Sequence, residues 1–156
     1  MKTESGFTIL EGMLAAVILA IGLLALAGMQ GVSLGRNVDA NELTIATNLA
    51  ADMMERIQFN RRNISAYNNI DTVLGTAPPS SSTMASGDYA QWLARLQTSP
   101  LQKPQGIVRV VPTGPSAPPL NENLVTVQVT WQGKVSGGSI LARSKNVSLV
   151  GVIALE

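Results

Sequence analysis

The chain has 156 residues, of which 46% are hydrophobic and 13% charged, and its formal net charge is +1. This length suits one globular domain with an appendage, and the near-zero charge gives no general argument for a polyanionic partner. There is no cysteine and no histidine, which excludes disulfides and thiolate metal sites and removes the commonest general base. We therefore expect no enzymatic activity, no cofactor and no metal site.

A short polar stretch is followed by a long apolar run. Residues 12–29 contain no polar side chain, and no charged residue occurs from Gly12 to Gly35. As a helix, residues 12–34 would be about 34 Å long, enough to cross a hydrocarbon core of about 30 Å. The run therefore predicts a membrane-spanning helix.

Three ordinary explanations of this run stay open. Residues 25–27, Ala-Leu-Ala, would suit a secretory signal, but Lys2 is offset by Glu4 and Glu11, and the run exceeds about 7–15 residues. A plain transmembrane anchor fits the length and leaves Glu11 unexplained. A buried core helix of this length is unusual in so small a chain.

The sequence SGFTILE, residues 5–11, places Gly6 at the end of the polar leader, then Phe7, then an acid at Glu11. This arrangement resembles the class III signal of type IV pilins and pseudopilins. The resemblance implies that residues 1–6 are a leader peptide, that a prepilin peptidase cuts after Gly6, and that the new amino terminus on Phe7 is methylated.

Glu11 lies at the start of the apolar run, where a charge costs about 2.5–3.5 kcal/mol at the bilayer centre. In the first helical turn the helix dipole favours a carboxylate. In a membrane or fibre, Glu11 would also meet the amine of Phe7 on a neighbouring subunit and fix the axial register between subunits. The alternative is that Glu11 only reaches toward the lipid headgroups.

The pattern becomes amphipathic after the apolar run. One helix is predicted from Thr8 to about Gln58, with a hydrophobic half over 7–35 and an amphipathic half over 36–62. The apolar stripe of the second half is Val38, Ile45, Leu49, Met53 and Ile57, flanked by Ala46, Ala50 and Met54. The charged residues expected to face away or flank it are Arg36, Asp39, Glu42, Asp52, Glu55 and Arg56.

Residues 63–156 read as a globular head. Residues 75–87 have the composition of a loop. A short helix is predicted over 88–99, capped by Ser86 or Asp88, with Trp92 packed on a sheet. Strands are predicted at 106–111, 123–131 and 146–155, the second with Val125, Val127, Val129 and Trp131 inward. The expected class is α+β, a long amino-terminal helix packed by its second half on a small antiparallel sheet.

Three further stretches extend the resemblance. They are AADMMERIQFNRRNISAY at 50–67, DYAQWLARLQ at 88–97 and VTVQVTW at 125–131. They look like the minor pilins called type IV pilus modification proteins, of the PilV type. The resemblance implies a pilin-like fold and a subunit that helps prime or cap a type IV pilus. It also implies an inner-membrane protein with a periplasmic head, later in the fibre, whose partners are lipid, the prepilin peptidase, and other major and minor pilins.

Two other functions stay open. The same fold serves minor pseudopilins of type II secretion, and a pilin at the fibre tip could bind DNA or a surface. Residues 95–156 hold six basic and two acidic residues, which is a weak basis for phosphate contacts because no aromatic residues alternate with them. Many major pilins close a carboxy-terminal loop with a disulfide, which this chain lacks the cysteines to form.

Overall fold

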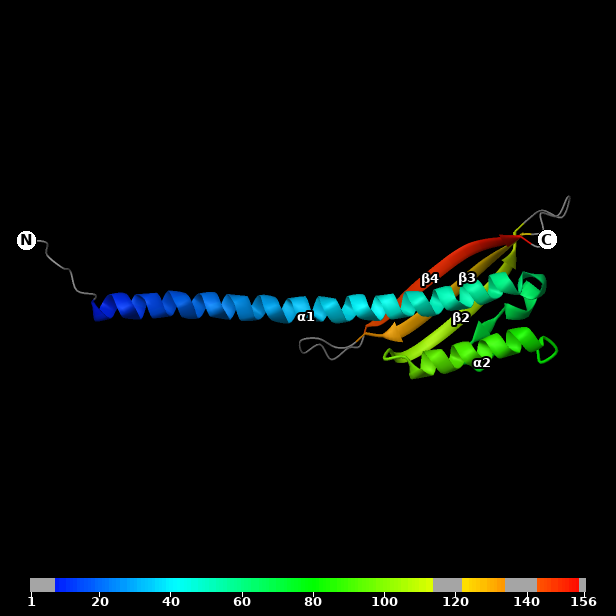
Figure 1. Ribbon diagram of the computed structural model, residues 1–156, viewed down its shortest axis with the longest axis horizontal. Helices are drawn as coiled ribbons and strands as arrows, with labels where there is room; N and C mark the ends of the chain where they lie inside the picture. Colours follow the sequence, from blue (N-terminus) through cyan, green and yellow to red (C-terminus); the bar gives the residue numbers. More distant parts are fainter. Residues whose placement is uncertain (1–7, 114–121, 134–142, 155–156) are drawn as a thin grey trace, which may run out of the picture. The chain divides into compact units, whose positions relative to one another are not determined.

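The computed structural model describes residues 8–113, 122–133 and 143–154 (Figure 1). Gly6 and Phe7 lie outside these residues. The chain forms two compact units, one ending at Val38 and the other beginning at Asp39. The elements are α1 (Ile9–Phe59), a 3-10 helix η1 (Arg61–Tyr67), β1 (Ile70–Asp71), α2 (Thr83–Thr98), β2 (Gln102–Pro112), β3 (Glu122–Gln132) and β4 (Ser144–Ala154).

The long helix is confirmed. α1 is one helix of 51 residues, within a residue of the predicted bounds at each end. Thr8 caps its start, because the Glu11 backbone N–H donates to the Thr8 carbonyl and lies 3.3 Å from the Thr8 hydroxyl. The helix is continuous through Gly28, although each interior glycine costs up to about 1 kcal/mol relative to alanine.

The second half of α1 supplies a large part of the core. Its buried side chains are Glu42, Ala46, Leu49, Ala50, Met53, Met54 and Ile57, which recur at helical spacing. Val38, predicted to be on the stripe, is 40% exposed. The expectation that Glu42 faces away or flanks the stripe was wrong: Glu42 is only 4% exposed. It lies one turn before Ala46, and a hydrogen-bonded partner on the sheet makes its burial tolerable.

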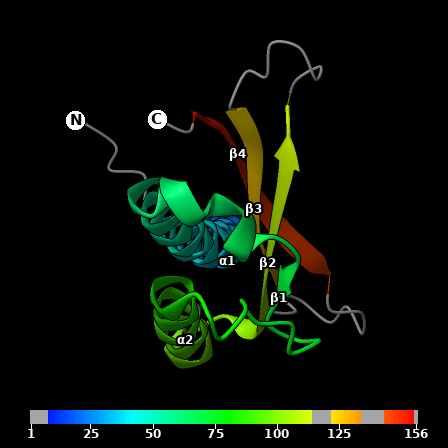
Figure 2. The same ribbon diagram turned by 90° about the vertical axis from the view of Figure 1, so that its right-hand side faces the viewer.

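The sheet has four strands in the order β1-β2-β3-β4, and every neighbouring pair is antiparallel. β3 alternates as predicted, with Val125, Val127, Val129 and Trp131 buried. Figure 2 shows α2 and the second half of α1 on the same face of this sheet. The architecture is therefore α+β, a long helix packed on a small antiparallel sheet, consistent with a pilin-like fold.

The helix α2 begins at Thr83, five residues before the predicted start, and its N-cap is Ser82 rather than Ser86 or Asp88. Ser86 lies inside the helix, where its hydroxyl donates to the Ser82 carbonyl at 2.7 Å. Trp92 is fully buried, as predicted, and its Nε1 donates to the Leu49 carbonyl at 2.8 Å. α2 is thereby fastened to α1 as well as to the sheet.

Candidate functional site

The first candidate is the apolar segment of α1, residues 9–35. Every large hydrophobic side chain from Ile9 to Leu34 is more than half exposed. α1 is the one helix among the described residues that is long and apolar enough to cross a membrane. Exposed apolar surface on this scale marks contact with lipid or with other proteins. The segment is therefore a surface for burial in an apolar phase.

Glu11 lies in the first turn of this segment, and it is exposed. Of the three predicted site residues, it is the one that the structure describes, because Gly6 and Phe7 lie outside the described residues. Between Gly12 and Gly35 the sequence offers no cation to pair with it. In an apolar phase the carboxylate would therefore need a cation from outside this stretch.

A partly buried ionic clasp that the sequence did not predict ties α1 to the sheet. The Glu42 Oε2 atom accepts from Trp131 Nε1 at 3.0 Å and lies 3.2 Å from Lys145 Nζ. Lys145 Nζ also lies 2.7 Å from Asp39 Oδ1. The hydrogen bond to Asp39 raises the pKa of Lys145 against the opposing effect of burial, and Glu42 adds to the rise. The clasp joins α1, β3 and β4. The only feature of the sequence that points to this clasp is the position of Glu42, which falls at the spacing of the buried residues of α1.

A second polar network joins α1, η1 and α2. Arg56 lies 3.2 Å from Asp52 Oδ1 and 3.1 Å from Asp88 Oδ1. The Tyr67 hydroxyl donates to Asp88 Oδ2 and accepts from Asn60 Nδ2. Burial, and then the hydrogen bond to Asp88, raise the pKa of Tyr67 above its ordinary value. These groups are committed to one another, so the network is structural.

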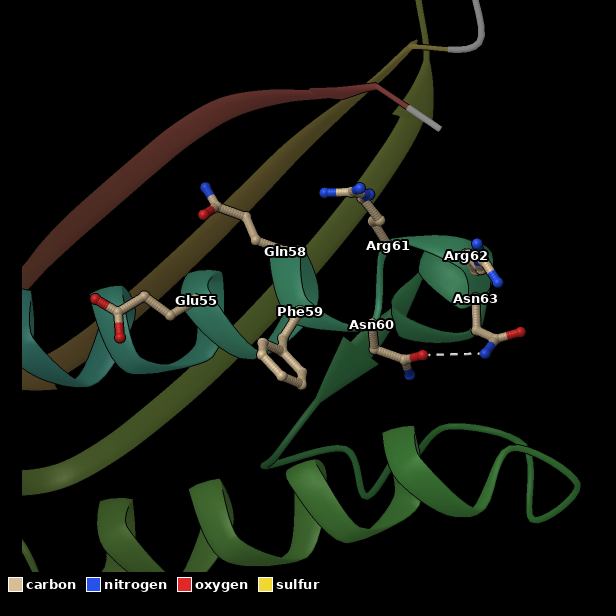
Figure 3. A pocket seen from close by; sticks show the side chains of 7 residues that line it. All are labelled: Glu55, Gln58, Phe59, Asn60, Arg61, Arg62 and Asn63. Atoms are coloured by element: carbon tan, nitrogen blue, oxygen red, sulfur yellow. Dashed lines mark hydrogen bonds between the residues drawn. The ribbon is translucent and has the colours of Figure 1, made fainter. Parts of the chain in front are cut away.

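A hollow of about 510 Å³ lies at the carboxyl end of α1 (Figure 3), lined by Glu55, Gln58, Phe59, Asn60, Arg61, Arg62 and Asn63. Phe59 is 88% exposed. In Figure 3 the Phe59 and Gln58 side chains point to opposite sides of the helix end, and Asn63 Nδ2 donates to Asn60 Oδ1 at 3.0 Å. The polar groups do not converge on one point, so the hollow is not organised for catalysis.

In the part of the chain that the structure describes, no group of three or more carboxylates could hold a metal ion. Comparisons with protein-family models, with curated proteins and with solved structures found no match. The function must therefore be argued from the residues of this chain.

Proposed function

We propose that the chain is a minor pilin, a structural subunit that helps prime or cap a type IV pilus. It is made with the leader 1–6, inserted in the inner membrane by the apolar segment, cut after Gly6 and methylated on Phe7. The observation that carries the proposal is α1, a single helix whose large hydrophobic side chains from Ile9 to Leu34 are all exposed. Its residues from Glu42 to Ile57 support a sheet.

The separation of an exposed apolar segment from a folded second unit suits assembly. Among the described residues of its own unit, the apolar segment has no packing partner. Its large side chains would therefore be covered by lipid before assembly and by other helices within a fibre. The second unit is already closed around its own core. A subunit built in this way can exchange lipid for neighbouring helices while the second unit stays folded.

Glu11 supplies the specificity of that exchange. Helix packing among apolar residues can slide, whereas a carboxylate in an apolar phase must find a cation. The amine of Phe7 on a neighbouring subunit is such a cation, since N-methylation keeps an amine's charge. Glu11 therefore selects the axial offset at which the two charges meet.

The test is recovery of Glu11 variants with fibres. Glu11→Val makes the segment more apolar, so insertion in the membrane and cleavage after Gly6 should both persist. Association should fail, and the variant should be retained in the membrane fraction and be poorly recovered with sheared fibres. Glu11→Gln keeps the size and hydrogen bonding but loses the charge, and recovery should fall here too.

The control is Glu55→Gln, which removes an exposed carboxylate from the second half of α1 and should assemble as the wild type does. Wild-type recovery of both Glu11 variants would refute the pairing. The apolar segment and Glu11 would serve a type II secretion pseudopilin equally well. Recovery with secretion pseudopilins in place of pilins would assign the chain to that system.

A further inference from the structure

The two edges of the sheet differ in how their backbone groups are satisfied. β2 and β4 are the long strands nearest the two edges, and the two-residue strand β1 covers only part of β2. In an antiparallel pair the N–H and C=O groups of alternate residues point toward the partner strand, and those of the residues between point away. One hydrogen bond at the end of each ladder therefore fixes which residues point outward.

The β2 edge is closed. The Thr113 N–H donates to the Glu122 carbonyl at 2.9 Å, so odd-numbered residues of β2 point toward β3 and even-numbered ones away. From Gly106 onward, each outward N–H group of β2 has a partner. Gly106 N–H donates to Thr72 Oγ1 at 2.8 Å and Val110 N–H to Asn68 Oδ1 at 3.0 Å. Val108 lies opposite Ile70 of β1, and Pro112 has no N–H.

The β4 edge is open. The Gly133 N–H donates to the Arg143 carbonyl at 2.8 Å, and the β3–β4 register runs without a shift from Gln132–Ser144 to Glu122–Ala154. The odd-numbered residues of β4 therefore bond to β3, and the even-numbered ones point outward. Among the described residues, nothing hydrogen-bonds to these outward backbone groups, which belong to Ser144, Asn146, Ser148, Val150, Val152 and Ala154.

Among the described residues, β4 itself carries none of the usual protections of an edge strand. Exposed edges are commonly blocked by proline, by a bulge, by a very short strand or by a charge. β4 has eleven residues, no proline and no register shift, and residues 146–154 carry no charge. Its single charged residue, Lys145, is bound to Asp39 and Glu42. Val150 and Val152 are each 61% exposed, and Val152 lies opposite Leu124 on β3.

We propose that the β4 edge is a docking site for an extended segment of a different polypeptide, which adds to the sheet as a further strand. Its backbone would bond to the outward groups of β4. Its side chains next to Val150 and Val152 would be uncharged, because a charge buried against these valines would lose its hydration without gaining a partner. The inference rests on the proposed function, which supplies the setting in which another subunit comes near.

A second copy of this chain is the poorer occupant. Its β2 edge is closed, so the sheets cannot continue head to tail. Lys145 contacts Glu42, and the Gly151 backbone lies against Met54, so β4 runs in the same direction as the second half of α1. An antiparallel β4–β4 pair would therefore reverse one helix relative to the other. Copies whose second units point the same way along a fibre, as the proposed function requires, could not form that pair.

Amide hydrogen exchange on the full-length mature chain tests the proposal directly. In detergent micelles, we expect the outward amides of β4 to exchange quickly and those bonded to β3 slowly. In sheared fibres containing the chain, the outward amides should slow by at least about tenfold, because each gains a hydrogen bond. Outward amides that exchange equally fast in micelles and fibres would overturn the proposal.

Proline scanning separates strand addition from general burial. Ser148→Pro removes an outward N–H without breaking a β3–β4 bond, a change that edge strands tolerate. Its matched control, Ser148→Ala, removes the same hydroxyl and keeps the N–H. We expect Ser148→Pro to be processed normally. Its recovery with fibres should fall about tenfold, which corresponds to the loss of a few edge hydrogen bonds. Ser148→Ala should match the wild type, and equal recovery of both variants would contradict strand addition.

A second pair of variants guards against misfolding by proline. Val150→Lys places a charge beside the incoming strand, whereas Val111→Lys places one at a 54%-exposed position of β2 on the same outer face. Only Val150→Lys should be recovered less well with fibres than the wild type. Because the chain has no cysteine, a disulfide dimer of Val152→Cys would identify a second copy as the occupant and refute the proposal. Wild-type chain that is absent from fibres would instead refute the proposed function, and this inference with it.

Discussion

At the scale of single residues, Glu42 is the least expected feature of the chain. Its Oε1 atom is buried without a hydrogen-bond partner among the described residues, a condition that costs about 1–3 kcal/mol. Sequence periodicity missed its burial because an acid next to an apolar stripe usually faces solvent. The bonds that compensate it come from Trp131 and Lys145, which lie about 90 and 100 residues further along the chain. Glu11, by contrast, stood out in the sequence because it interrupts an apolar stretch.

Replacing Glu42 by alanine should destabilise the second unit by about 2–3 kcal/mol, because it leaves Trp131 Nε1 buried without an acceptor and Lys145 with one partner. The matched control is Asp39→Ala, which removes the 60%-exposed partner of Lys145 and should cost less than about 1 kcal/mol. Urea midpoints of the full-length chain in micelles, followed by tryptophan fluorescence, would compare the two. Equal effects would show that the Trp131 bond contributes nothing.

Asp71 should make stability depend on pH in the acid range. Burial alone would raise its pKa, but hydrogen bonds from Gln105 and from the backbone N–H groups of Leu74 and Val73 outweigh burial and lower it. Its contribution is therefore present above the ordinary value of 3.8 and lost as pH falls through the lower folded pKa. Asp71→Asn should be about 1 kcal/mol less stable at pH 7. The gap should narrow as pH falls below 3.8 toward the lower folded pKa, and a gap that widens on acidification would contradict this assignment.

At the scale of elements, α1 was the most predictable part. Its 3.6-residue periodicity and the absence of proline defined it almost to the residue. α2 was placed too late, because the serine-rich residues 80–82 and Ser86 have the composition of a loop, whereas Ser86 is accommodated by a bond to the preceding turn. The strand β1 was missed, since two residues carry no periodic signal. Which strand lies at an edge depends on pairing across the whole sheet, so the β4 edge could not be read from the sequence.

The packing of α2 on β2 depends on Gly106. A Cβ atom there would collide with the Trp92 ring and lie 2.8 Å from Leu96 Cδ1. Gly106→Ala should therefore lower stability by about 1–3 kcal/mol, the usual cost of overpacking. Gly151→Ala is the control, because its Cβ would lie 3.6 Å from Met54 Sδ, an ordinary contact, and should change stability by less than about 0.5–1 kcal/mol. If the thermal midpoints of the two variants in micelles fall equally, the collision with Trp92 is not the cause of the lost stability.

At the scale of the whole molecule, the chain combines a unit closed around its own core with a segment whose large apolar side chains are exposed. The sequence predicted this contrast, because charge and hydropathy change abruptly near Arg36. It also led to the proposal that the chain is processed between Gly6 and Phe7. It did not suggest where a neighbour would attach to the second unit, because that depends on exposure and strand order.

Processing should depend on the small residue before the cut. A peptidase site needs close access to the backbone, and Gly6 leaves that access unobstructed. Gly6→Val should therefore accumulate at full length in the membrane fraction, while Ser5→Val, one residue further from the cut, should be shortened normally. A normally shortened Gly6→Val protein on an immunoblot would mean that the peptidase does not recognise the leader as proposed.

The central claim is that this chain is a processed pilin, and the amino-terminal residue of the membrane-associated protein tests it most directly. Intact-mass and peptide mass spectrometry of the wild-type chain should find Phe7 at the amino terminus, carrying one added methyl group. A chain beginning at Gly28, after the Ala-Leu-Ala sequence, would indicate an ordinary secretory signal. A chain that retains Met1 together with the whole leader would indicate an uncleaved anchor, and either result would contradict the account.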